Sequence, residues 1–239
     1  MMGAFFYGVA LQWKLDIRSK TLLITCYAVP LLFFFLMGEI FTSIDPQARE
    51  TLIPSMTVMG VSMGALIGLP PSLAELYGGE IRKMYRANGI PLYLGLAATF
   101  LSAFLHLLIM SGILYAVAPP VFGAMLPTHP PAYFSALTLF IAVSLSLGCT
   151  LGLAVQNQAR LTMLSQLVFL PSIMLSGILF PSALLPRFLA ALGQLFPATW
   201  GFRALLNGGA LPGNLWPQAA VLAAAAVACG LLLRRLRFD

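Results

Sequence analysis

One short motif in the chain matches the pattern that surrounds a nucleophilic serine. Gly60-Val-Ser-Met-Gly64 fits Gly-x-Ser-x-Gly, which in serine hydrolases places the serine on a sharp turn between a strand and a helix. Such a serine needs a histidine base, and His106 is the histidine that lies deep in an apolar stretch. An intramembrane serine hydrolase that uses Ser62 with His106 is therefore one hypothesis for the chain.

A second interpretation of the same glycines explains more residues. The motif lies inside a long apolar run, and small residues recur there at every fourth position. At this spacing they form one face of a helix and let two helix backbones approach closely within lipid. We therefore predict a role in helix packing, rather than catalysis, for Gly60, Gly64, Gly68, Gly148 and Gly152.

Other familiar chemistries have no support in the sequence. It contains neither the Gly-x-x-x-x-Gly-Lys-Ser/Thr loop that cradles nucleotide phosphates nor a His-Glu-x-x-His zinc motif. The three cysteines lie in apolar runs without a His or Cys partner at metal-ligand spacing. We expect no catalytic residue, metal or cofactor in this chain. His106 either bonds to a neighbouring helix or faces a substrate path, and the sequence leaves both possibilities open.

The composition explains why these residues lie in apolar surroundings. Of the 239 residues, 60% are hydrophobic and 8% are charged, whereas soluble domains average about 25% charged residues. The net charge of +6 comes from 13 basic and 7 acidic residues gathered in a few clusters, without the basic stripe of a nucleic-acid-binding protein. The chain is therefore expected to be an integral membrane protein that contacts the lipid bilayer and no nucleic acid.

Six apolar stretches approach the length of about 20 residues that a helix needs to cross a bilayer. The predicted fold is an all-α membrane protein that forms a single domain over 1–239, with the second span ending at Pro70 and Pro71. The six predicted spans are 21–41, 52–69, 92–118, 133–155, 161–180 and 215–233.

The basic residues between the spans predict the orientation. With the N-terminus inside, ten basic residues lie on the cytoplasmic side and three on the outer side, which is the bias that the positive-inside rule describes. Both termini are then cytoplasmic, and the composition suits a bacterial plasma membrane. The inner residues are Lys14, Arg18, Lys20, Arg82, Lys83, Arg86, Arg160, Arg234, Arg235 and Arg237, and the outer ones are Arg49, Arg187 and Arg203.

Three segments outside the spans have distinct characters. Residues 5–20 mix apolar and charged side chains and predict an amphipathic helix that lies on the inner leaflet, with Trp13 at headgroup depth. Residues 72–91 form the largest inner loop and contain a charged, helix-compatible run over 76–88. Residues 181–214 are apolar but interrupted by proline and glycine, which predicts two short re-entrant or interfacial helices on the outer side.

Two stretches of the chain resemble a known family, the ABC-2 type permeases of ATP-binding-cassette exporters. The stretch 79–91 is similar to the family's cytoplasmic loop motif, with Glu80 where the family usually has threonine. The stretch 175–181, with Pro186 and the Leu-Phe-Pro-Ala-Thr-Trp run that ends at Trp200, is similar to the family's outer segment. With six spans and an N-terminal interfacial helix, the resemblance covers nearly the whole chain.

The resemblance implies a half-transporter. Two permease subunits, identical or paralogous, would flank a central path and bind two cytosolic ATPase subunits, which hold the ATP and magnesium. It further implies that 76–88 is the coupling helix, that 5–20 braces it, and that the helices at 184–196 and 199–206 help to close the path from outside. The coupling residues would be Glu75, Glu80, Arg82, Lys83, Tyr85 and Arg86, and the path or gate residues His106, Phe180, Pro181, Pro197 and Trp200.

The cargo and one rival class stay open. Spans without charge suit amphipathic drugs, lipids or lipid-linked molecules equally well, and the direction of export comes from the resemblance alone. A polytopic scaffold or lipid-binding protein without an ATPase partner would share the composition, but it would have no reason to resemble both the coupling loop and the outer segment.

Overall fold

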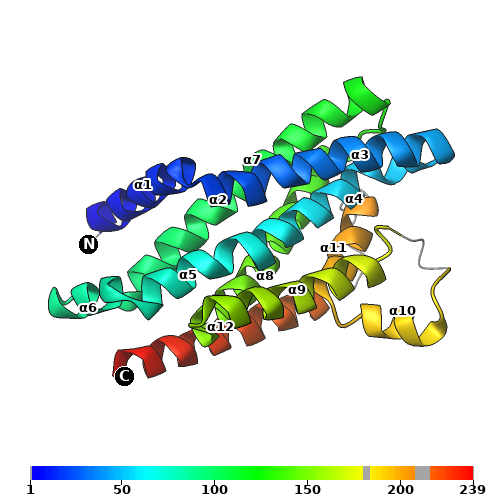
Figure 1. Cartoon of the computed structure of the whole chain (residues 1–239). Coiled ribbons are helices and arrows are strands. Elements are labelled where there is room, and N and C mark those ends of the chain that lie inside the picture. Colours follow the sequence, from blue (N-terminus) through cyan, green and yellow to red (C-terminus); the bar gives the residue numbers. More distant parts are fainter. Residues whose placement is uncertain (1, 180–183, 208–215, 239) are drawn as a thin grey trace.

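The computed structural model describes residues 2–179, 184–207 and 216–238, and all regular structure within these ranges is helical (Figure 1). A chain of such apolar composition forms helices because these satisfy every backbone hydrogen bond within one segment. The first half of the chain contains α1 (Met2–Arg18), α2 (Lys20–Leu23), the π-helical turn η1 (Ile24–Ala28), α3 (Val29–Ile44), α4 (Ala48–Met63), the π-helical turn η2 (Gly64–Gly68), α5 (Leu69–Gly78) and α6 (Glu80–Ala87).

The second half begins with the two longest helices. These are α7 (Leu92–Phe122) and α8 (Pro130–Ala154), followed by α9 (Gln158–Leu175), two short helices α10 (Arg187–Gly193) and α11 (Pro197–Leu206), and the last helix α12 (Trp216–Phe238). Proline starts α8 and α11, where its missing N–H group costs no hydrogen bond.

Five continuous helical segments in the described part of the chain are long and apolar enough to cross a membrane: Lys20–Ile44, Ala48–Gly78, Leu92–Phe122, Pro130–Ala154 and Trp216–Leu236. The protein is therefore a multi-pass, all-helical membrane protein, as the sequence predicts. The helix α9 corresponds to the fifth predicted span, but with Arg160, Gln166 and several hydroxyl side chains it is not among the five.

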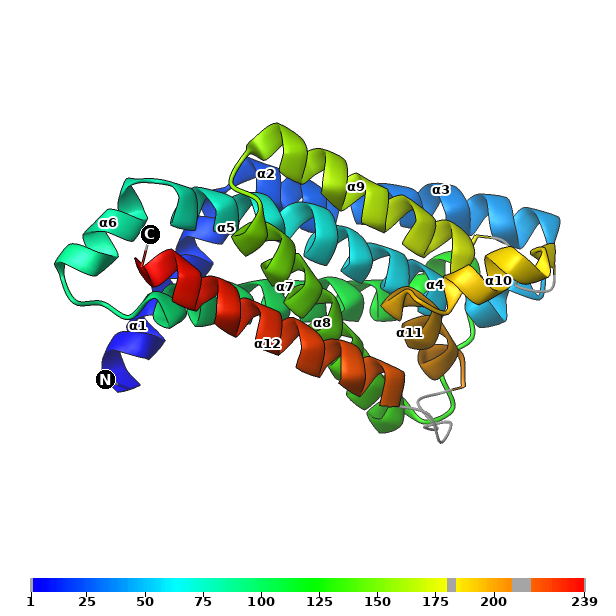
Figure 2. The ribbon, with the colours of Figure 1, turned by 90° about the horizontal axis from the view of Figure 1, so that it is seen from below.

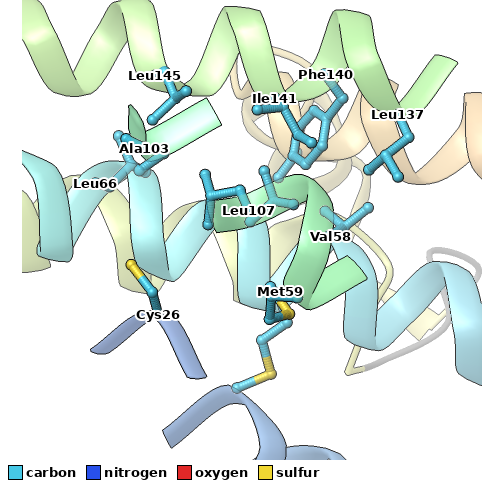
Figure 3. Packing of buried hydrophobic residues seen from close by; sticks show 14 of the residues in the cluster. Cys26, Val58, Met59, Leu66, Ala103, Leu107, Leu137, Phe140, Ile141 and Leu145 are labelled. Atoms are coloured by element: carbon cyan, nitrogen blue, oxygen red, sulfur yellow. The ribbon is translucent and has the colours of Figure 1, made fainter. Parts of the chain in front are cut away.

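The two ends of the helix bundle carry different elements. Both termini and α6 lie at one end, and α10 and α11 lie at the other (Figures 1 and 2). The segment Ala48–Gly78 is the most enclosed of the five, with 89% of its apolar window buried, against 28% for the first segment and 17% for the last. Figure 3 shows part of the core between the helices, where Phe140 and Ile141 of α8 point toward Leu107 of α7, and Leu66 lies beside Ala103.

The second predicted span does not end at Pro70 and Pro71. The helix continues through both prolines to Gly78, which gives one unbroken rod from Ala48. A proline removes one helical hydrogen bond and crowds the preceding turn. Here the wider turn η2 directly precedes the prolines, as η1 precedes Pro30 in the first span. Local π-helical turns of this kind allow membrane helices to accommodate proline.

The N-terminal helix packs against the bundle. Helix α1 packs along α7, the third membrane segment (Figure 1). Its exposed apolar side chains, Tyr7, Leu11 and Leu15, lie one turn apart, while Asp16 is buried. Trp13 is half-buried and stacks on His106 of α7. The helix therefore buries Asp16 against the protein, while an apolar stripe and the charged residues Lys14 and Arg18 stay exposed.

Candidate functional site

The charged helix α6 is set apart from the helices on either side of it by glycine. Gly79, in an extended conformation, separates α6 from α5. At the other end, Gly89 adopts φ +65°, and the Ile90 N–H donates to the Tyr85 carbonyl at 2.8 Å. A left-handed glycine with this hydrogen bond is a common way to end a helix. The helix spans Glu80–Ala87, shorter than the predicted 76–88, because Leu76 to Gly78 still belong to α5.

Two contacts join the end of α5 and α6 itself to the start of α7. The Tyr77 hydroxyl, at the end of α5, donates to the Leu92 carbonyl at the start of α7, with 2.6 Å between the oxygens. The Tyr85 ring lies against Gly95 of α7, where an added Cβ would come within 3.0 Å of it. Tyr85 therefore packs against its own chain, and α6 projects from a closed base at the end of the bundle.

The outer face of α6 combines apolar and charged side chains. Ile81 and Met84 are 40% and 62% exposed, one turn apart. Glu80 and Lys83 are exposed and form an ion pair of 2.7 Å, while Arg82 is half-buried and Glu75 is exposed on α5. The side chain of Arg86 lies outside the described part of the structure. Exposed apolar residues in an amphipathic helix are the anchors that a partner groove accepts.

Sequence reasoning did not select Ile81. The signal was present, because Ile81 and Met84 are spaced by three residues in an otherwise charged helix, and that spacing places them on one face.

The first set of glycines faces the first and third membrane segments. A Cβ at Gly60 would come within 2.5 Å of Met110, and one at Gly64 would overlap the end of the Leu107 side chain. At Gly68 the nearest atom would be the Thr25 hydroxyl oxygen, at 3.0 Å. These neighbours are side chains of this same chain.

The second set of glycines makes tighter contacts, with backbone atoms. A Cβ at Gly148 of α8 would overlap the carbonyl oxygen of Ala65 in η2, and one at Gly152 would lie 2.8 Å from the carbonyl oxygen of Pro70. Helix α8 therefore approaches the central rod at backbone distance, and a carbonyl group cannot rotate away as a side chain can.

A buried carboxylate joins α1 to α7. Asp16 is 5% exposed; it accepts hydrogen bonds from Gln12 Nε2 at 2.8 Å and from the Ser102 hydroxyl at 2.5 Å. About one turn before Asp16 in α1 and one turn after Ser102 in α7, the Trp13 ring stacks on His106, with 4.0 Å between ring centroids. We call Trp13, Asp16, Ser102 and His106 the α1–α7 latch.

His106 also contacts the first membrane segment. Its Nδ1 lies 2.8 Å from the Tyr27 hydroxyl in η1, and its Nε2 is buried without a hydrogen-bond partner among the described residues. The imidazole therefore joins α1, η1 and α7 at one point.

If the α1–α7 latch holds α1 against α7, removing Asp16 should loosen α1. An Asp16→Ala variant loses two hydrogen bonds and leaves the buried Ser102 hydroxyl without this partner, at a cost of about 2 kcal/mol. We expect trypsin to cut the detergent-solubilised variant after the exposed Arg18 much faster than the wild type. Glu39→Ala, which removes an exposed carboxylate, is the control and should be cut at the wild-type rate. Equal cleavage of all three proteins would contradict the latch.

The geometry does not assemble a serine hydrolase. Ser62 lies in the interior of α4 and not on a turn that follows a strand. Within the described ranges, neither ring nitrogen of His106 bonds to Ser62, and no group of three metal-ligating side chains occurs. A nucleophile needs its base within hydrogen-bond reach, so Ser62 and His106 lack the arrangement that this hypothesis requires.

The outer segment folds back on itself. The Thr199 hydroxyl donates to the Gly193 carbonyl at 2.6 Å, and Trp200 Nε1 donates to the Gln194 carbonyl at 2.8 Å. Pro197 is the first residue of α11, which packs on α8, where a Cβ at Gly201 would overlap the Phe140 ring. The remaining gate candidates, Phe180 and Pro181, lie outside the described residues.

Comparison with known families assigns the chain to one of them. The family model described as ABC-2 type transporter matches residues 4–208. The chain therefore belongs to the ABC-2 type transporter family, whose membrane domains are transport subunits rather than catalytic domains and usually work with an ATP-binding subunit. No curated protein sequence matches the chain significantly.

Proposed function

We propose that the chain is the permease subunit of an ATP-driven exporter and that α6 couples it to a separate cytosolic ATPase subunit. The observation that supports this most is the geometry of α6. It is a short helix that leaves the end of the bundle between two glycines, is closed at its base by the Tyr77–Leu92 hydrogen bond, and keeps Ile81 and Met84 exposed. A helix with this surface suits a groove in a partner.

The connections of α6 suggest how movement would reach the membrane. On one side, Gly79 joins α6 to the rod Ala48–Gly78, and on the other the Tyr85 ring of α6 lies against Gly95 near the start of α7. ATP-driven closure of the partner would push both segments at once. Since the glycine contacts leave little space between the rod and α8, we expect these segments to shift together as rigid bodies and to reorient the central path.

The proposed assembly follows from this role. Two permease chains, identical or paralogous, would enclose the path and bind two ATPase subunits that hold ATP and magnesium. We propose α9 as the sixth span, because it runs lengthwise along the bundle and packs on the rod Ala48–Gly78 and on α8 (Figure 2). The α10–α11 segment would help to close the path on the outer side. The cargo would be an amphipathic drug, a lipid or a lipid-linked molecule.

Purification from the native membrane tests this proposal. A tagged chain extracted in mild detergent should bring with it a cassette-type ATPase in a one-to-one ratio, with ATP hydrolysis that vanadate inhibits. Recovery of the folded chain with no ATPase, under conditions that keep other transporter complexes intact, would contradict the proposal and favour a scaffold or lipid-binding role.

The proposed orientation, with both termini in the cytoplasm, makes a separate prediction. The three native cysteines, Cys26, Cys149 and Cys229, are buried, so a cysteine introduced at an exposed site should be labelled selectively. Met84 of α6 and Met125 in the α7–α8 connection are both exposed, and these two elements lie at opposite ends of the bundle (Figure 1). In intact cells, a membrane-impermeant maleimide should label Met125→Cys at once and Met84→Cys only after lysis. The reverse pattern would invert the orientation.

A further inference from the structure

A cavity of about 690 Å³ lies at the end of the bundle that carries both termini. One wall is the connection from α6 into α7, with Gly89, Pro91, Leu92 and Tyr93, and the other is the last part of α12, with Gly230, Leu233 and Arg234. In Figure 2 the α6–α7 connection runs beside the C-terminal end of α12. This volume lies within the range of 300–1,000 Å³ that is usual for small-ligand sites.

Two glycines leave the cavity open. A Cβ built at Gly89 or at Gly230 would meet no atom within 4 Å, in contrast to the packed glycines of the core. Gly89 needs its positive φ to end α6, so this wall follows from the same backbone geometry that positions the coupling helix. At Gly230, the missing side chain leaves space along α12.

The lining combines apolar walls with one positive charge. Pro91, Leu92 and Leu233 are apolar, Arg234 is exposed, and the lining contains no acidic side chain. Tyr93 is 57% exposed at the start of a membrane segment, the depth at which tyrosine gathers near lipid headgroups. Arg234 follows the apolar part of α12 directly, so the charge lies where an apolar span reaches the headgroup layer.

We propose that this cavity binds an anionic phospholipid from the leaflet on the side of the termini. Arg234 would hold the phosphate, and the apolar walls would take the upper part of the acyl chains. Basic pockets between membrane helices bind anionic headgroups in this way, whereas a soluble phosphate would leave the apolar walls unused. The bound lipid would contact the Gly89–Pro91 connection and thereby brace the base of α6.

Native mass spectrometry of the purified full-length chain tests the site. The probes are phosphatidylglycerol, phosphatidylcholine and glycerol phosphate, each added to the detergent-solubilised protein. We expect about fivefold better retention of phosphatidylglycerol than of phosphatidylcholine, the factor that corresponds to about 1 kcal/mol for one basic residue at an anionic surface. Arg234→Gln should remove this preference, and Arg234→Lys should keep it. Gly230→Leu, which fills the cavity, should reduce the binding of both lipids.

Two matched variants serve as controls. Arg160→Gln removes an exposed charge at the start of α9, and Gly112→Leu adds the same bulk to another open glycine, about 30 Å along α7 from Leu92. Both should retain lipid as the wild type does. The site is refuted if Arg234→Gln keeps the wild-type preference, if Arg160→Gln loses it equally, or if glycerol phosphate displaces the lipid. Since no ATPase is involved, this result is independent of the proposed transport role.

Discussion

A Gly148→Ala variant is expected to lose about 3 kcal/mol of folding free energy, the upper end of the usual cost of overpacking a core. The added methyl group would overlap the carbonyl oxygen of Ala65, which belongs to the backbone of the central rod. No side-chain rotation can relieve that contact, so α8 must move away from the rod. At Gly64 the obstacle is the flexible end of Leu107, and Gly64→Ala should therefore cost markedly less.

Thermal unfolding in mild detergent, followed by size-exclusion chromatography, measures this difference. Gly112→Ala is the matched control, because nothing lies within 4 Å of a Cβ at that position of α7. Alanine is favoured over glycine in a helix by about 1 kcal/mol, so the control should unfold at or above the wild-type temperature. If Gly148→Ala unfolded at the same temperature as Gly112→Ala, the close approach of α8 to the rod would be contradicted.

The second large effect is expected at α6. A double variant, Ile81→Asp with Met84→Asp, should lower the recovery of the ATPase about 30-fold, because a lost interface anchor costs about 2 kcal/mol or more. Both side chains are exposed, so the fold of the permease should be unaffected. Reversing the charges of Arg82, Lys83 and Arg86 should also weaken docking, while the loss of the exposed Glu80–Lys83 pair contributes little to stability.

Co-purification with the tagged chain, normalised to the amount of folded permease, measures the effect. The control is Met125→Asp with Leu126→Asp, which alters two exposed apolar residues at the opposite end of the bundle. This pair should recover the wild-type amount of ATPase. Equal recovery with the α6 double variant would show that Ile81 and Met84 do not dock the partner.

The general architecture could be predicted from the sequence because lipid imposes a simple rule on helix length and composition. The apolar runs correspond to long helices, and the charged run between Gly79 and Gly89 to a short one. The end of the second span could not be predicted in the same way. Pro70 and Pro71 look like a stop, yet the wider turn before them keeps the helix continuous.

The spacing of residues in the sequence could not predict the contacts between distant segments. Asp16 reads as one charge among several in an amphipathic helix, and its hydrogen bond to Ser102 depends on how α1 lies against α7. The glycine spacing indicated close packing, but it could not show that Gly148 faces a backbone carbonyl while Gly64 faces a flexible side chain. Those differences arise from the tertiary arrangement.

The most direct test of ATP-driven coupling through α6 is a cross-link from that helix to its partner. Met84→Cys would be joined to the co-purified ATPase with a short thiol-to-amine reagent, and the buried native cysteines should leave the background low. We expect a permease–ATPase product from Met84→Cys and none from Met125→Cys. An ATPase that co-purifies but links equally to both positions, or only to Met125→Cys, would contradict α6 as the coupling helix.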